Sequence, residues 1–223
     1  FSHCPDAETR AYHQRRVDIL TPLVKALSTE VGNEVAYIGV QVHGGMGFIE
    51  ETGAAQYMRD ARILPIYEGT NGIQALDLIG RKLLRDQGTA ARELFADLKQ
   101  DLLPANELGL EPLAQPVLDS FELCEQAIHF VFEQARSDAH FAGAVAFDLL
   151  LLISNSVAAA LMVKSAIVAQ RALNNGSDKA QFHKTKLATV TFYVEHVLPR
   201  TEAYYRSLKK GHASTMAVDV DAF

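Results

Sequence analysis

The amino-acid sequence predicts an all-α protein. Apolar residues recur at intervals of three and four along several long segments, which is the spacing that places side chains on one face of a helix. No segment shows the sustained alternation of apolar and polar residues that is typical of a strand. The chain has 223 residues, of which 48% are hydrophobic and 22% are charged, as in ordinary globular proteins. The sequence therefore predicts a helical protein of one or two domains.

The first part of the chain is expected to contain three helices, over residues 21–42, 52–63 and 71–85. Pro22 suits the first turn of the first helix, where its missing N–H has no partner to lose. The glycine-rich segment 43–47 ends that helix. In the third helix, Asn71 and Gln74 have the spacing of a capping box, and Gln87-Gly88 marks its end.

The second part of the chain is expected to contain three longer helices, over residues 113–135, 144–173 and 182–198. Pro112 and Pro116 suit the first turns of the first of them. The second is apolar nearly all round, which is typical of a helix at the centre of a bundle, and Asn174-Asn175-Gly176 ends it. Pro199 is placed to end or kink the third. From Gly211 the chain shows no helical pattern, so we expect either a loose tail or an arm on a partner chain.

A change in character between Asp86 and Thr89 indicates a domain boundary. Before it, glycines separate short elements, and after it come long helices with few special residues. The sequence therefore predicts a first helical domain over residues 1–87 and a second helical domain over residues 88–223.

The charge of the chain argues against nucleic-acid binding. The formal net charge is −6, and residues 90–223 carry 12 basic and 16 acidic side chains. An acidic region repels phosphates. The longest uncharged stretch, residues 149–163, is shorter than the roughly 20 apolar residues that span a bilayer and contains three polar residues. We therefore expect neither nucleic acid nor a membrane as a partner.

The cysteines and histidines do not form a metal-binding pattern. Cys4 and Cys124 are far apart in the sequence and no C-x-x-C pair occurs, so we expect no disulfide framework, no metal site and a reducing compartment. Cys124 is expected in the core. His129 and Glu133 share a helix face, but the third and fourth ligands of a metal are missing.

Glu68 is a carboxylate in an unusual place. It follows the apolar residues Ile66 and Tyr67 and precedes Gly69 just before a helix. Unpaired N–H groups at a helix start favour anions and polarised oxygens, and glycine lets another molecule approach the backbone. A carboxylate buried there has a raised pKa, which suits a general base near neutral pH. The alternative is that Glu68 caps the helix or pairs with Arg59 or Arg62.

A second candidate site is the glycine-rich turn that contains Gly44 and Gly45. Glycines at a turn can hold a phosphate group. This turn follows a helix rather than a strand and lacks the G-x-G-x-x-G spacing, so it is not a Rossmann fingerprint. Taken alone, it is also what a glycine cap at the end of a helix looks like.

Three motifs in sequence order carry a resemblance to a known family. They are Gln41-Val42-His43-Gly44-Gly45-Met46-Gly47-Phe48, Tyr57-Met58-Arg59-Asp60-Ala61-Arg62-Ile63 and Ile66-Tyr67-Glu68-Gly69-Thr70-Asn71-Gly72-Ile73-Gln74. In this order and at these spacings, they resemble the C-terminal helical domain of the flavin-dependent acyl-CoA dehydrogenases. The match covers roughly residues 21–85. The segment 73–83, followed by an added helical region, resembles the larger branch of the family, which includes 3-methylmercaptopropionyl-CoA dehydrogenases.

The resemblance implies a role for each matched residue. Glu68 aligns with the base that takes the α-proton of an acyl-CoA thioester, while the β-hydrogen leaves as hydride to flavin. Gly69 aligns with a position near the substrate. Five residues align with contacts to FAD, the first three often from the neighbouring subunit: Gln41, Gly44, Gly45, Thr70 and Gly72. Arg59 and Asp60 align with a motif that organises the loop by ion pairing.

Two positions depart from the family pattern. The position of Gly72 often holds Glu or Gln in the family, so any contact from Gly72 is by its backbone. His43 stands where Phe or Leu is common, and it either touches the flavin or is a packed, non-reactive histidine.

The resemblance also implies the larger setting of the chain. The family's N-terminal helical domain and middle β-domain have no counterpart here, and the chain starts at Phe1. We therefore expect a C-terminal portion of a dehydrogenase, with the first domain truncated at its start and catalytically silent by itself. The implied partners are an acyl-CoA and an electron-transfer flavoprotein, in a homodimer or homotetramer in the bacterial cytoplasm. The alternatives are a non-catalytic assembly module and an alkylation-response-type flavoprotein domain, although the acidic second region disfavours the DNA link of the latter.

Overall fold

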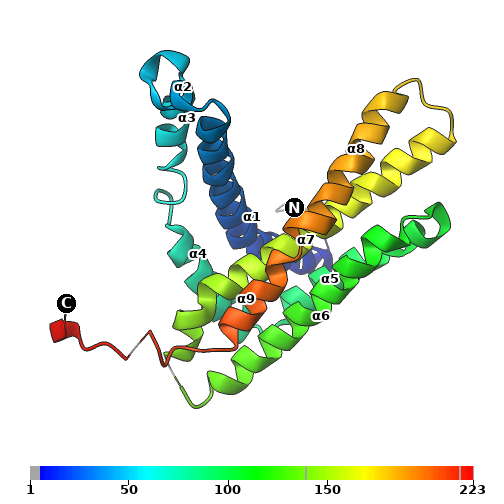
Figure 1. The fold of residues 1–223 in the computed structure, drawn as a ribbon. Helices are drawn as coiled ribbons and strands as arrows, with labels where there is room; N and C mark the ends of the chain where they lie inside the picture. Colours follow the sequence, from blue (N-terminus) through cyan, green and yellow to red (C-terminus); the bar gives the residue numbers. More distant parts are fainter. Residues whose placement is uncertain (1–5, 139, 216, 223) are drawn as a thin grey trace.

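The computed structural model describes residues 6–138, 140–215 and 217–222, and these contain helices and turns but no strand. The all-α prediction is confirmed. Figure 1 shows a bundle from which α1, with α2 and α3 at its far end, projects on one side and the end of α7, with α8, on another.

The first helix is longer than the sequence analysis predicts. Helix α1 spans Ala7–Val42, and the carboxylate of Asp6 caps it by accepting a hydrogen bond from the backbone N–H of Thr9 at 2.7 Å. The predicted start at residue 21 is therefore wrong, and Pro22 lies inside the helix rather than in its first turn.

The chain then folds back along α1 through short elements. These are α2 (Gly45–Phe48), the 3₁₀ turn η1 (Glu50–Thr52) and α3 (Ala54–Ala61), followed by α4 (Asn71–Asp77) and the π-helical segment η2 (Leu78–Leu84). Helix α3 packs against α1. The helix predicted over residues 52–63 is shorter than expected, and the one predicted over 71–85 changes from α to π geometry partway along.

The remaining elements form the bundle. They are α5 (Thr89–Leu102), η3 (Leu103–Leu108), α6 (Glu111–Gln134), α7 (Phe141–Asn174), α8 (Ala180–Phe192), the π-helical segment η4 (Tyr193–Val197), α9 (Arg200–Leu208) and the 3₁₀ turn η5 (Val220–Ala222). Helix α5 was not predicted as a separate element. Pro199 separates η4 from α9, as its position predicts.

Helix α7 is the central element, as predicted from its all-round apolar sequence. It packs against α1, α4, α5, α6, α8 and α9. Its polar residues Ser154, Asn155 and Ser156 are buried and donate hydrogen bonds to carbonyls one turn back in the same helix, at 2.6, 2.8 and 3.0 Å. By length and composition α7 could cross a membrane, but 67% of its most apolar stretch is buried within the protein. This burial identifies α7 as a core helix.

One hydrophobic core runs through the bundle. It includes Ile19 of α1 and Leu78 of η2 as well as Leu149 and Leu152 of α7. The core therefore crosses the predicted boundary at residues 87 and 88, where the chain turns through two residues with positive φ, Gln87 and Gly88. The division into domains 1–87 and 88–223 stays a prediction.

Candidate functional site

Glu68 lies at the middle of a short loop between α3 and α4. The N–H groups of Ile66 and Tyr67 both donate to the carbonyl of Ile63, at 2.9 and 3.1 Å. Glu68 has a φ of 55° and Gly69 a φ of 82°. The left-handed region is common for glycine but costs a residue with a side chain about 1–2 kcal/mol, so the surrounding hydrogen bonds hold Glu68 in an unfavourable backbone conformation.

The expectation that Glu68 is buried is wrong for this chain. Its side chain is exposed, because the residues expected to wall it off, Ile66 and Tyr67, are themselves 47% and 46% exposed. The alternative ion pair with Arg59 does not form either. Arg59 instead makes a two-point ion pair with Glu50, at 2.8 Å for each contact. The backbone of Glu68 is therefore held in a defined conformation, while its carboxylate is exposed to solvent.

The residues after Glu68 build the start of α4. Thr70, rather than the predicted Asn71, is the cap, since its Oγ1 accepts a hydrogen bond from the N–H of Ile73 at 3.2 Å. Gln74 reaches back with Nε2 to the carbonyls of Glu68 and Gly69, at 3.5 Å each. A Cβ at Gly69 would lie 3.0 Å from that nitrogen. Glycine is thus favoured at residue 69 by its left-handed backbone conformation.

The side chain of Asn71 has a role that the sequence analysis missed. It is buried and points to α1, where it bonds to Lys25, Thr29 and Glu30. These partners are more than 40 positions away in the sequence, so no local spacing reveals them. The capping-box assignment was wrong because the tertiary contacts take up the amide of Asn71.

The glycine-rich turn lies at the far end of α1. Gly44 has a φ of 60° and a ψ of −143°, a combination that glycine adopts readily. Gln41, Gly44 and Gly45 are exposed, and no atom lies within 4 Å of a Cβ built at either of these two glycines. His43 is exposed rather than packed, with Nδ1 2.7 Å from the carbonyl oxygen of Gly39. The turn therefore leaves space beside Gly44 and Gly45 for a ligand, while the N–H of Gly44 donates to the carbonyl of Gln41 at 3.1 Å.

The structure does not bring the two candidate sites together. The start of α4 lies against residues 25–30 of α1, whereas Gly44 follows the end of that helix. At 1.5 Å per residue, the two sites are roughly 20 Å apart along α1. Separate clefts adjoin them, one of about 470 Å³ that Thr70 and Gly72 help to line and one of about 250 Å³ beside His43 and Tyr57.

No metal site adds to these features. Within the ranges that the structure describes, no group of three or more His, Cys, Asp or Glu side chains is arranged to hold a metal ion. His129 and Glu133 contact each other at 3.3 Å on the exposed face of α6. Cys124 is buried, and Cys4 lies outside the described residues.

Two family models match this chain, one on each side of residues 85–87. The model described as "Acyl-CoA dehydrogenase, C-terminal domain" matches residues 4–84, and the model described as "Acetyl-CoA dehydrogenase C-terminal like" matches residues 88–219. The chain belongs to the acyl-CoA dehydrogenase family.

Individual relatives agree with this assignment. The chain is 41% identical over 204 residues to 3-methylmercaptopropionyl-CoA dehydrogenase from Ruegeria pomeroyi, an alignment that covers 90% of this chain and 34% of that protein. It is 28% identical to a butyryl-CoA dehydrogenase from Syntrophomonas wolfei over 98% of this chain and 36% of that protein. It is also 28% identical to the broad-specificity linear acyl-CoA dehydrogenase FadE5 from Mycobacterium tuberculosis, over 92% and 35%. The chain thus spans about a third of the length of these relatives.

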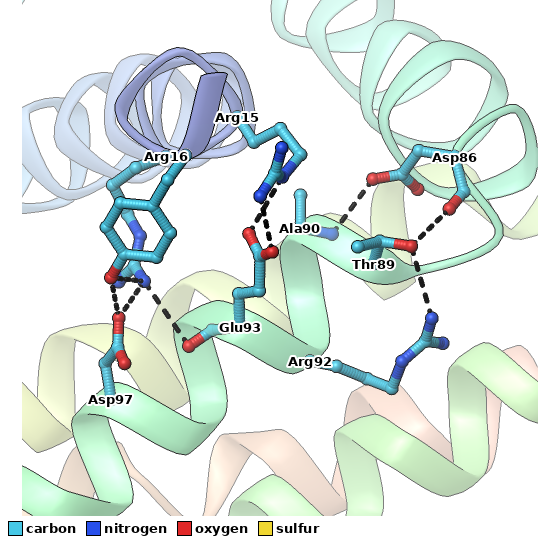
Figure 2. A network of polar contacts seen from close by, with 9 residues as sticks. Arg15, Arg16, Asp86, Thr89, Ala90, Arg92, Glu93 and Asp97 are labelled. Carbon is cyan, nitrogen blue, oxygen red and sulfur yellow. Dashed lines mark hydrogen bonds and ion pairs between the residues drawn. The ribbon is translucent and has the colours of Figure 1, made fainter. Parts of the chain in front are cut away.

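A polar network joins the two segments that the acyl-CoA dehydrogenase models match. Figure 2 shows Arg15 and Arg16 of α1 facing Glu93 and Asp97 of α5. Tyr12 of α1 also donates a hydrogen bond to Asp97. Because this network links α1 to α5, it fixes the position of α1 against the bundle.

The start of α5 is fixed within the same network. The carboxylate of Asp86 accepts hydrogen bonds from the N–H groups of Gly88 and Ala90, at 2.9 Å each. This carboxylate occupies the helix start, the place where an anionic ligand would otherwise bind. The sequence predicts a boundary here, but its local spacing does not indicate these contacts.

Proposed function

We propose that this chain is the C-terminal part of an FAD-dependent acyl-CoA dehydrogenase and that Glu68 is the base that removes the α-proton of the acyl-CoA. The observation that carries the proposal is the left-handed backbone of Glu68. Non-glycine residues held in this region cluster at functional sites. The 41% identity to a dehydrogenase acting on a CoA thioester supports it.

The chemistry requires a base and a group that stabilises the enolate. The α-C–H of a thioester is weakly acidic, so charge develops on the thioester oxygen as Glu68 takes the proton. Among the described residues, no acceptor is hydrogen-bonded to the backbone N–H of Glu68. This N–H is free to donate to the thioester oxygen, as the family resemblance implies. When bound, FAD accepts the β-hydrogen with its electron pair, and the product is a 2-enoyl-CoA.

Five residues of this chain are suited to hold parts of FAD. Gln41, Gly44, Gly45, Thr70 and Gly72 are all exposed. The two glycines of the turn carry no side chain that would block the close approach of a ligand, although the N–H of Gly44 already donates to the carbonyl of Gln41 at 3.1 Å. Gly69 belongs to the substrate side of the same loop. Because Gln41, Gly44 and Gly45 lie roughly 20 Å along α1 from Glu68, we assign them to a cofactor held mainly by a second copy of the chain. This assignment favours a homodimer or homotetramer.

An uncovered apolar surface supports a larger assembly around Glu68. Many exposed apolar side chains of the protein lie on α1, α2, α3 and the loop before α4; they include Val35, Val42, Met46, Phe48, Tyr57 and Ile63. Apolar patches of this kind mark interaction sites. Covering this surface would exclude water from the surroundings of Glu68. The same surface also favours the second candidate function, a non-catalytic assembly module.

The remaining assignments follow from family membership and composition. We propose an acyl-CoA as substrate, an electron-transfer flavoprotein as electron acceptor and the bacterial cytoplasm as the location. The net charge of −6 disfavours nucleic acid as a partner, and the burial of α7 disfavours a membrane.

Two experiments separate the dehydrogenase from the assembly module. The first compares steady-state enoyl-CoA formation by the full-length protein with that of its Glu68→Gln and Glu51→Gln variants. Glu51 is a suitable control because it is also an exposed glutamate, in the 3₁₀ turn η1. We expect activity to be lost only in Glu68→Gln, and unchanged turnover in that variant would favour the assembly module. The second mixes the isolated chain with FAD and an acyl-CoA, and flavin reduction there would contradict the proposal that the chain is silent by itself.

A further inference from the structure

The side chain of Asn71 is fixed in one orientation by two opposite charges. Only 4% of the residue is exposed. Its Oδ1 accepts a hydrogen bond from Nζ of Lys25 at 2.7 Å, and its Nδ2 donates to Oε1 of Glu30 at 2.7 Å and to Oγ1 of Thr29 at 2.9 Å. A carboxamide turned by 180° would set its oxygen against the carboxylate and its NH₂ group against the ammonium. The three partners on α1 therefore allow one placement of Asn71.

The backbone of Asn71 closes the loop that carries Glu68. Its N–H donates to the carbonyl of Pro65 at 3.1 Å. Glu68 is the third residue after Pro65 and the third before Asn71, so it lies at the tip of the closed loop. One residue therefore joins the two ends of the loop to each other and, through its side chain, to the longest helix of the protein.

We propose that Asn71 is a positioning residue for proton abstraction: by fastening the loop to α1, it sets the place of the Glu68 carboxylate. This inference rests on the proposed function of Glu68. The side-chain amide of Asn71 is taken up by Lys25 and Glu30 of α1 and only 4% of the residue is exposed, so it acts through the loop. A base displaced by about 1 Å can lose roughly 10²-fold in rate, which makes the fastening of the loop a determinant of turnover.

The main test is Asn71→Ala in the full-length protein, with Asn155→Ala as the matched control. Asn155 is also 4% exposed, and its Nδ2 donates to the carbonyl of Leu151 within α7 at 2.8 Å. For Asn71→Ala we expect kcat to fall roughly 10²-fold, with KM for the acyl-CoA changed by less than about threefold because ground-state binding is not affected. For Asn155→Ala we expect a loss of stability with kcat per folded, flavin-loaded molecule unchanged.

A second readout does not depend on turnover. Amide hydrogen exchange at Glu68, Gly69 and Thr70 is expected to speed up in Asn71→Ala and to stay unchanged in Asn155→Ala, because only the first substitution releases the loop. Equal exchange at these three amides in both variants, together with equal kcat, would overturn the proposal.

Two further variants test the proposal if Asn71→Ala fails to fold: Asn71→Asp alone, and Asn71→Asp combined with Glu30→Gln. Asn71→Asp places a carboxylate against Glu30 and should reduce kcat, while adding Glu30→Gln supplies an NH₂ donor to the new carboxylate and keeps Lys25 paired. We expect the double variant to recover kcat to within about threefold of wild type. Equal kcat for Asn71→Asp with and without Glu30→Gln would overturn the proposal.

The same set of variants separates the two claims. Retained turnover in Glu68→Gln would overturn the function proposed for Glu68 and the positioning role with it. Loss of turnover in Glu68→Gln, combined with wild-type kcat and exchange in Asn71→Ala, would overturn the positioning role alone.

Discussion

Arg15 on α1 and Glu93 on α5 form a two-point ion pair. The Nε and Nη2 atoms of the guanidinium lie 2.9 and 2.6 Å from the two carboxylate oxygens. The pair joins the two segments that separate family models match (Figure 2). Its side chains are 37% and 28% exposed, so solvent screens the interaction in part.

The first prediction concerns the strength of this pair. A double-mutant cycle with Arg15→Ala and Glu93→Ala should give a measurable favourable coupling in the free energy of unfolding, because two-point Arg–carboxylate contacts are stronger than ordinary surface pairs. Urea denaturation measures it. The one-point pair of Lys164 with Asp101, at 2.7 Å, is the control and should give a smaller coupling. Equal couplings for the two pairs would contradict the argument from geometry.

The second prediction concerns pH and the contact between α1 and α9. Arg200 Nη1 and Nη2 donate to the two carboxylate oxygens of Glu34 at 2.8 and 2.7 Å, and these hydrogen bonds lower the pKa of Glu34 below its ordinary value of 4.5. Because the unfolded chain binds this proton at higher pH than the folded one, the stabilisation is present above pH 4.5 and is lost as the pH falls through the lower, folded pKa.

Thermal unfolding of wild type and Glu34→Gln tests this prediction. The variant should unfold at a lower temperature at neutral pH, and the difference from wild type should shrink as the pH falls below the ordinary pKa of a glutamate. If the difference in unfolding temperature stayed constant down to strongly acidic pH, the ion pair would not be its cause.

The third prediction concerns the tight approach of α2 to α1. A Cβ at Gly47 would lie 2.2 Å from the carbonyl oxygen of Val40 and 2.9 Å from Cβ of His43. Gly47→Ala should therefore cost about 1–3 kcal/mol in the free energy of unfolding. Gly45→Ala, where no atom lies within 4 Å of the new Cβ, is the control and should be nearly neutral. Similar unfolding midpoints for the two variants would show that the turn between α1 and α2 rearranges to accept the added methyl group.

The fourth prediction concerns the reactivity of Cys124. Burial raises its pKa to about 12, and Ser156 lies 3.4 Å from its sulfur. The thiolate is the reactive form, so a thiol reagent at mildly alkaline pH should label Cys124 only as the protein unfolds. The measurement is labelling of a Cys4→Ser background with and without urea. Rapid labelling of the folded protein would place the thiol at the surface.

The sequence predicted the central helix well and the first helix poorly, for a physical reason. Helix α7 is apolar on all sides, and only a buried position satisfies such a segment. The first part of α1 has no apolar stripe, and the buried residues of that helix are Ile19, Pro22, Leu23 and Ala26. Before Ile19, the helix is held to α5 by charged and polar side chains, and the hydrophobic period carries no information about such distant ion pairs.

The candidate site was located from the sequence, but its surroundings were not. The motif around Glu68 and its glycine neighbour predicted the loop before α4. The burial of Glu68 could not be predicted correctly, since it depends on what covers Ile66 and Tyr67, and the described residues do not cover them. Asn71 was taken for a helix cap because the local spacing is the same whether its amide bonds to its own helix or to α1.

The most direct test of the central claim is the rate at which an acyl-CoA loses its α-hydrogen to the full-length protein. The protein is mixed rapidly with α-deuterated or with unlabelled acyl-CoA. The decrease of flavin absorbance with time then gives that rate. We predict a clear isotope effect in wild type, an unchanged rate in Glu51→Gln, and a rate about 10³-fold lower in Glu68→Gln. A Glu68→Gln variant that bleaches its flavin as fast as wild type would show that another group takes the proton.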